Sequence, residues 1–116
     1  MSRQRAKGTW YETAVSAYLA EVLGRVVMRL GMGGVNDRGD LHVDGLDVTI
    51  ECKNHARMAL AEWMDEAERE SANAGSRFGV VVHHRRGRGA ARIADSYVTM
   101  RLGDFAALIG MILEDE

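Results

Sequence analysis

The 116 residues of this chain suffice for one small domain with a single hydrophobic core, and 47% hydrophobic and 28% charged residues are ordinary for a globular protein. No apolar stretch approaches the roughly 20 residues of a membrane-spanning helix, and no apolar run follows the basic N-terminal residues as in a secretory signal. The single Cys52 excludes an internal disulfide and a cysteine-rich zinc site. We therefore expect a cytoplasmic protein without membrane association.

The first half of the chain combines one helix with short strands. Apolar residues at helical spacing predict a helix over 8–23, with Gly24 as its stop. The valine-rich run 25–30 predicts a strand, and the glycine-rich stretch 31–39 predicts a loop. Two strands at 40–43 and 46–53 are joined by Asp44-Gly45, which is typical of a two-residue hairpin turn.

The second half continues with a helix over 59–75, in which Trp63 and Met64 have the spacing of packing residues. Strands are predicted at 77–84 and 96–102, and a C-terminal helix with a wide apolar stripe at 103–116. The order helix, three strands, helix, strand, strand, helix predicts an α/β layer fold with a mixed sheet. We expect a single domain over residues 1–116.

Charge is segregated along the chain although the net charge is only −2. An N-terminal arm over 1–8 and a flexible loop over 83–92 are basic and contain no carboxylate, whereas acids gather in 61–70 and at the C-terminus. Such segregation indicates a surface for polyanions, with two ordinary solvated runs as the alternative. The basic residues of the arm and the loop are Arg3, Arg5, Lys7, Arg85, Arg86, Arg88 and Arg92.

The hairpin places acids and a lysine on one face. Side chains alternate along a strand, so Asp47, Thr49, Glu51 and Lys53 share one face, whereas Leu46, Val48, Ile50 and Cys52 take the core face. A two-residue turn would pair Val43 with Leu46, His42 with Asp47 and Asp40 with Thr49, placing Asp40 one diagonal step from Glu51, about 7–8 Å between Cβ atoms. Two such carboxylates can bind a hard divalent cation, with Lys53 beside it for a phosphate or a water. The alternative is a solvated ion pair of Glu51 and Lys53 on an exposed sheet face.

Asp40 followed by Glu51-Cys52-Lys53 across a hairpin resembles the motif of the PD-(D/E)XK nuclease superfamily, which includes type II restriction enzymes and archaeal Holliday junction resolvases. The resemblance spans about Lys7 to Val82 and implies a restriction-endonuclease-like fold: three layers, with a central mixed sheet flanked by helices. The resolvase branch carries a further glutamate on the first helix, where Glu12 matches. The motif proline is absent, so Asp37 in "NDRGD" remains a rival to Asp40.

The resemblance also implies the roles of the site residues. Asp40, Glu51 and the backbone carbonyl of Cys52 would hold Mg²⁺, for which Mn²⁺ can substitute, and Glu12 would complete the site directly or through water. Lys53 would assist the nucleophilic water. The basic residues Arg3, Arg5, Lys7, Arg38, Arg85, Arg86 and Arg88 would contact DNA phosphates.

The sequence thus predicts a Mg²⁺-dependent, structure-selective DNA endonuclease, most closely a Holliday junction resolvase that acts on four-way junctions as a homodimer and needs no nucleotide cofactor. Alternatives are a nuclease of this fold acting on nicked, flapped or duplex DNA, a catalytically inactive DNA-binding module, and an α/β interaction domain. A pure binding module has no need to keep two repelling carboxylates, which favours the enzyme. The histidines do not have the order of an HNH-type metal site.

Overall fold

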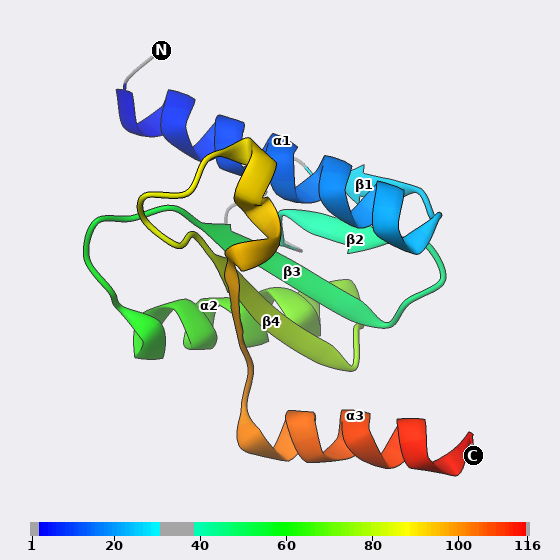
Figure 1. The fold of residues 1–116 in the computed structure, drawn as a ribbon. Coiled ribbons are helices and arrows are strands. Elements are labelled where there is room, and N and C mark those ends of the chain that lie inside the picture. Colours follow the sequence, from blue (N-terminus) through cyan, green and yellow to red (C-terminus); the bar gives the residue numbers. More distant parts are fainter. Residues whose placement is uncertain (1–2, 31–38, 116) are drawn as a thin grey trace.

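The computed structural model describes residues 3–30 and 39–115, apart from the side chains of residues 4 and 5 (Figure 1). The elements follow the predicted order, with one addition, a short 3₁₀ helix between the last two strands. They are α1 (Arg3–Leu23), β1 (Val27–Arg29), β2 (Leu41–Val43), β3 (Val48–Lys53), α2 (Leu60–Ala74), β4 (Phe78–His83), η2 (Ala90–Asp95), β5 (Tyr97–Thr99) and α3 (Leu102–Glu114).

Within the described residues, the strands form one five-stranded sheet in the order β1-β2-β3-β4-β5. Only β3 and β4 are parallel, and the other neighbours are antiparallel, so the predicted mixed sheet is confirmed. Helix α1 covers one face of the sheet and α2 covers the other (Figure 1). The helix between β3 and β4 makes the parallel pairing possible, because a parallel connection requires a crossover.

Each face of the sheet has its own apolar cluster. Tyr11 and Val15 of α1 pack on Leu41 and Ile50, together with other buried side chains of the strands. On the other face, Trp63 and Ala67 of α2 pack on Val81, which confirms Trp63 as a packing residue. Strand β4 is buried along its whole length, as its nearly continuous apolar sequence predicts for a strand covered on both faces.

Helix α2 approaches the sheet closely at Gly79. A Cβ atom at this residue would lie 2.6 Å from the backbone oxygen of Ala67. Only glycine therefore allows α2 to lie this near to β4, and the close approach brings the sheet-facing side chains of α2 over β3 and β4.

The connection between β2 and β3 differs from the predicted two-residue turn. It comprises residues 44–47, and His42 pairs with Thr49 instead of Asp47. The cause lies in Asp47, whose carboxylate and carbonyl oxygens accept hydrogen bonds from the amides of Arg77 and Phe78 over 2.9 and 3.2 Å. Asp47 is thereby used to position the start of β4 and does not belong to the hairpin ladder.

This correction moves the register by two residues, and a shift of two leaves every side chain on its predicted face. The ladder between β2 and β3 ends at the pair of Leu41 and Ile50. Asp40 lies just before it, and its amide also bonds to Ile50, so the predicted diagonal pairing of Asp40 and Glu51 is not part of the ladder. Leu46 is the exception: it lies in the turn and is 44% exposed, so its assignment to the core was wrong.

Two predicted basic segments have more regular structure than expected. The described part of the N-terminal arm belongs to α1, which begins at Arg3. The basic loop is shorter than predicted, since η2 begins at Ala90 and includes Arg92.

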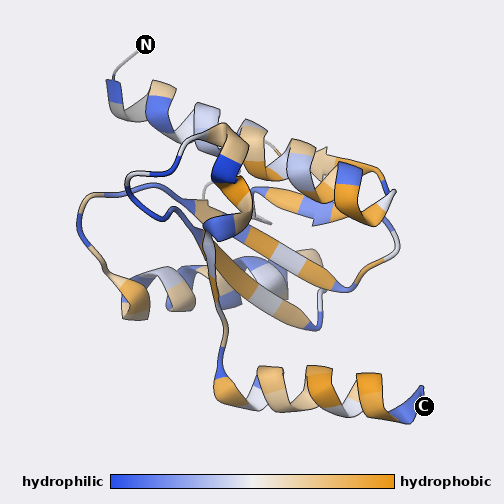
Figure 2. Ribbon diagram, in the orientation of Figure 1, coloured by the Kyte–Doolittle hydropathy of each residue, from blue (hydrophilic) through white to orange (hydrophobic). Residues whose placement is uncertain are grey.

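Helix α3 stands apart from the other elements (Figure 1) and is mostly hydrophobic (Figure 2). None of its residues is buried. The side-chain contacts that link it to the body include an ion pair between Arg101 and Glu68 and a contact of 3.4 Å between Arg77 Nη1 and Met111 Sδ. None of the described helices is long and apolar enough to cross a membrane.

Candidate metal and phosphate site

Glu51 lies in the middle of the sheet and faces an acid of α2 that the sequence did not indicate. Glu51 and Glu70 are only 5% and 2% exposed. Burial raises the pKa of Glu51 strongly, and its contact with the Glu70 carboxyl and the nearby charge of Asp40 raise the pKa further. Two buried carboxyls in contact require a shared proton or a cation, because two adjacent negative charges repel.

Glu66 extends this acidic pair. One carboxylate oxygen each from Glu51, Glu66 and Glu70 lies within 4.8 Å of the other two, an arrangement that could hold a metal ion. Glu66 and Glu70 are four residues apart and therefore lie on the same side of α2. The three oxygens come from two elements whose separation is fixed by the close contact at Gly79.

Lys53 lies beside these acids. Its Nζ is 2.8 Å from Oε2 of Glu66 and 3.5 Å from Oε1 of Glu51. Burial alone lowers the pKa of Lys53, but the hydrogen bond to Glu66 and the charge of Glu51 outweigh it and raise the pKa. Lys53 is therefore a fixed cation, suited to a phosphate or to developing negative charge, and is not a free base.

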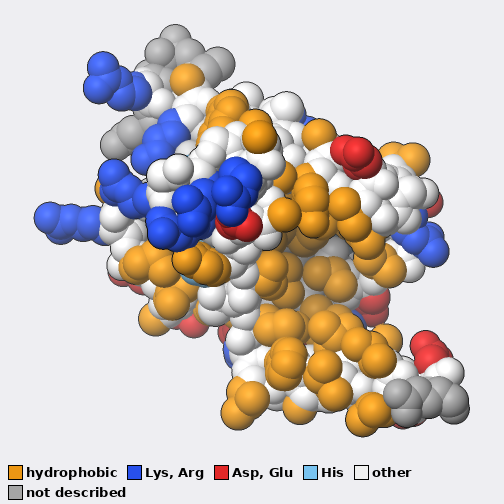
Figure 3. Space-filling view, in the orientation of Figure 1, with side chains coloured by type: hydrophobic (Ala, Val, Ile, Leu, Met, Phe, Trp, Pro, Cys, Tyr) orange, Lys and Arg blue, Asp and Glu red, His pale blue; other side chains and the backbone are white. Residues whose placement is uncertain are grey.

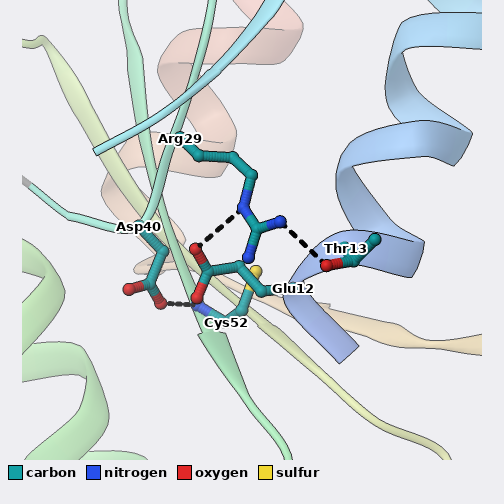
Figure 4. Close-up of polar contacts among 5 residues, drawn as sticks. All are labelled: Glu12, Thr13, Arg29, Asp40 and Cys52. Carbon is teal, nitrogen blue, oxygen red and sulfur yellow. Dashed lines mark hydrogen bonds and ion pairs between the residues drawn. The ribbon is translucent and has the colours of Figure 1, made fainter. Parts of the chain in front are cut away.

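Asp40 is held by backbone and side-chain hydrogen bonds. Its amide donates to the carbonyl of Ile50 over 3.0 Å, and its carbonyl accepts from the amide of Leu30 over 2.9 Å. Its Oδ2 accepts a hydrogen bond of 2.7 Å from the amide of Cys52 (Figure 4). Gly39, with a φ of +95°, supplies the backbone turn that places Asp40 here, a conformation that glycine adopts readily.

Glu12 reaches the same region from α1, on the other side of the sheet. Figure 4 shows its carboxylate beside Asp40 and the Cys52 amide, with Arg29 above it. Burial and the charge of Asp40 raise the pKa of Glu12, while Arg29, whose Nε lies 3.4 Å from Oε1 of Glu12, partly offsets both. Glu12 thus lies next to Asp40, and its role in completing the site stays a prediction.

Cys52 packs its side chain against the core on the α1 face. Burial raises the pKa of its thiol strongly, and the charges of Asp40 and Glu12 add to this. The thiol is thus kept protonated, and the contribution of Cys52 to the site comes from its backbone.

The predicted DNA-contacting residues are spread over two neighbouring segments. Lys7 and Arg86 line one pocket between α1 and the loop after β4. Asp95 pairs with Arg88 at 3.2 Å and with Arg92 at 2.8 Å, so the fold brings a carboxylate to a run that has none in sequence. Arg3 is exposed on α1. The side chain of Arg5, the whole of Arg38 and the rival acid Asp37 lie outside the described residues.

The structure thus brings Asp40, Glu51, Cys52 and Lys53 together, with Glu12 at the edge. Sequence reasoning missed Glu66, Glu70 and Arg29. The sequence did contain an indication that Glu70 is buried. Glu70 lies three residues after Ala67 and seven after Trp63, on the apolar stripe of α2, where an acid is unexpected.

No family model, curated protein or solved structure matches this chain.

The donor set fits a hard divalent cation. Carboxylate and carbonyl oxygens are the ligands that Mg²⁺ and Mn²⁺ take in proteins, whereas the sulfur of Cys52 points into the core. A cation at the acids would also offset the burial and the repulsion that together raise the pKa of Glu51. The residues available for it are Asp40, Glu51, Glu66, Glu70 and the Cys52 carbonyl.

Proposed function

We propose that this protein is a metal-dependent DNA endonuclease with a restriction-endonuclease-like fold, which acts on branched DNA such as a four-way junction. The observation that carries the proposal is the grouping of three side chains: Asp40, which accepts a hydrogen bond from the amide of Cys52, the buried Glu51 beside it, and Lys53 two residues further along β3.

The arrangement of the elements supports the fold part of the proposal. Helix α1, strands β1 to β3, helix α2 and strand β4 follow in the order implied by the resemblance to the PD-(D/E)XK superfamily. The helices lie on opposite faces, as a three-layer fold requires. Asp40 lies immediately before β2, and Glu51 lies within β3.

In the proposed enzyme, Asp40, Glu51 and the Cys52 carbonyl would hold Mg²⁺, with Glu70 and Glu66 as further ligands. When bound, Mg²⁺ lowers the pKa of a coordinated water and polarises a phosphoryl oxygen. Lys53 stabilises negative charge at the scissile phosphate, and its ion pair with Glu66 fixes the ammonium group in place. Glu12 holds Arg29 near Asp40.

The charge of the surface suits a nucleic-acid backbone. Figure 3 shows Lys and Arg side chains gathered over the N-terminal part of α1 and the loop after β4. Lys7, Arg85 and Arg86 belong to these segments. Contacts to phosphates confer affinity without sequence information, so we expect recognition of DNA shape.

A two-fold homodimer would supply the two sites that symmetric cutting of a junction needs, and α3 offers a surface for it. Its apolar side chains Phe105, Ile109 and Ile112 are all exposed (Figure 3). Glu114 and Asp115 lie at the carboxyl end of α3, where the helix dipole disfavours acids. Antiparallel pairing with α3 of a second copy would bring Arg101 and a helix amino end to these acids, so we propose that the occupant is a second copy.

The decisive experiment compares cleavage of a labelled four-way junction with cleavage of matched duplex and flap DNA in Mg²⁺. Paired nicks in the junction and little cutting of duplex are expected. Lys53→Ala should lower the rate by about a hundredfold or more. Arg25→Ala is the control, because Arg25 is exposed beside the β2–β3 turn, away from the acids.

Other outcomes would separate the parts of the proposal. Cutting of every substrate would retain the nuclease and remove the preference for junctions. Binding without cutting in either Mg²⁺ or Mn²⁺ would contradict the enzyme and favour a DNA-binding module.

A further inference from the structure

A groove leads away from the candidate site, between α1 and the loops that follow β3 and β4. Its inner part, about 260 Å³, is lined by Cys52, Asn54 and Lys7, among others. Its outer part, about 360 Å³, shares Lys7 and Asn54 and adds Trp10, His84 and Arg86. The groove therefore begins at Cys52, one of the residues of the candidate site, and ends at the basic loop.

Hydrogen bonds hold the walls of the groove together. Nδ2 of Asn54 donates to the carbonyl of Lys7 over 3.4 Å, joining the β3 loop to α1. His84 contacts Oδ1 of Asn54 through Nδ1 at 3.2 Å and the carbonyl of Arg88 through Nε2 at 2.6 Å. Three separate segments are thus fixed around one space.

Trp10 gives this space an aromatic wall. Its ring meets the His84 ring edge-on, with centroids 5.5 Å apart. The side chain nevertheless remains 39% exposed, whereas the other tryptophan, Trp63, is 6% exposed. An aromatic wall with Lys7 and Arg86 beside it combines a surface for stacking with two cations for phosphate, the combination that proteins use for single-stranded nucleic acid.

We propose that this groove binds an unpaired DNA nucleotide next to the scissile phosphate, with its base against Trp10 and its phosphate between Lys7 and Arg86. The inference rests on the proposed nuclease function and makes its substrate more specific. A base inside a duplex is stacked on its neighbours and cannot lie against a side chain in a pocket. Branch points, flaps and frayed ends present unpaired nucleotides at a smaller cost than intact duplex does.

The test measures binding without cleavage, in EDTA, so it does not depend on catalysis. In Trp63→Phe protein, Trp10 is the sole indole, and its fluorescence reports on the groove. Single-stranded oligonucleotide and four-way junction should change this fluorescence at saturation, whereas duplex with closed hairpin ends should bind without changing it. Binding itself is followed by the anisotropy of a dye on the DNA.

A second measurement keeps Trp63 and compares affinities. Trp10→Ala should weaken single-strand binding by about 5- to 150-fold, the loss of one stacked base, and leave closed-duplex binding within about twofold. Trp10→Phe should restore most of the loss. Tyr97→Ala, which removes an exposed aromatic outside the groove, should change neither affinity.

The proposal is overturned if Trp10 fluorescence stays constant while anisotropy shows saturation with single-stranded DNA, or if Trp10→Ala binds single strands normally. A mononucleotide that binds as tightly as the oligonucleotide would also overturn it, since the ligand would then be a free nucleotide. If Trp10 responds as expected but no substrate is cut in Mg²⁺, the groove is supported and the nuclease function alone fails.

Discussion

Oδ2 of Asp40 accepts a hydrogen bond from the backbone amide of Cys52 over 2.7 Å. Strand β2 begins only at Leu41, so the side chain of Asp40 takes the place of a neighbouring strand for this amide. One carboxylate thereby fixes the end of the β2–β3 hairpin and lies beside Glu51 and Glu12. Structural and proposed catalytic roles of Asp40 are therefore separable by mutation.

Asp40→Asn should keep the hydrogen bond to Cys52, because the amide oxygen of asparagine also accepts. Asp40→Ala loses it, and we expect its free energy of unfolding to lie about 1–3 kcal/mol below that of Asp40→Asn. Both variants should lose cleavage in the junction assay. Urea denaturation checks the stabilities, and equal stability of the two variants would contradict the role of this bond.

Glu51→Gln should stabilise the metal-free protein, and more at high pH than at low pH. The pKa of Glu51 is raised from 4.5, so above this value the folded state binds more protons than the unfolded state. Stability must then fall as the pH rises, and the variant escapes this loss. We expect a gain on the order of 1–3 kcal/mol at pH 8 and a smaller one at pH 5.5.

Urea denaturation in EDTA at the two pH values measures this difference. The lowered pKa values of His55 and His83 act in the opposite direction below about pH 6.5 but are common to both proteins. The difference between variant and parent therefore isolates Glu51. If the gain in unfolding free energy does not grow with pH, the pKa of Glu51 is not raised in the folded protein.

Glu70→Gln tests the acid that α2 contributes. Loss of a ligand and of its charge should weaken Mg²⁺ binding by about tenfold or more. The Mg²⁺ concentration needed for half-maximal cleavage measures this change. Glu62→Gln is the matched control on the same helix, because Glu62 is exposed in its first turn. The same Mg²⁺ dependence in both variants would exclude Glu70 from the metal site.

Ile109→Glu and Ile112→Glu should convert the proposed dimer into a monomer. A charge in the centre of an apolar interface removes a major contact, and we expect the dissociation constant to rise about 30-fold or more. Sedimentation equilibrium measures it, with Met58→Glu as a control at an exposed apolar residue outside α3. A parent protein that is monomeric at micromolar concentration would disprove the dimer.

The fold was largely predictable because its signals are local. Apolar spacing located the described helices and strands within a few residues, with the helix stop at Gly24 correct. The hairpin register depends on distant contacts: Asp47 accepts hydrogen bonds from the amides of Arg77 and Phe78, about thirty positions later, and therefore lies in the connection and not in the predicted ladder. The faces of β3 survived the error only because the register moved by an even number of residues.

The candidate site was predictable only along the strands. Asp40, Glu51 and Lys53 follow the two-residue alternation of a single hairpin, so their proximity could be deduced. Glu66, Glu70 and Arg29 come from elements whose placement depends on tertiary packing, and no spacing rule connects them to Glu51. A buried position for Glu70 on the apolar stripe of α2 was the one available signal.

The glycine contact beneath α2 has a consequence for ion selectivity. Mg²⁺ requires oxygen ligands at about 2.0–2.1 Å, and Ca²⁺ accepts longer distances of about 2.3–2.6 Å. Glu51 belongs to the sheet and Glu66 and Glu70 to α2, so the width of the proposed site depends on how closely that helix lies on β4. In the proposed site, Gly79 would therefore influence which ionic radius the acids accommodate, because its missing side chain allows α2 to lie close to β4.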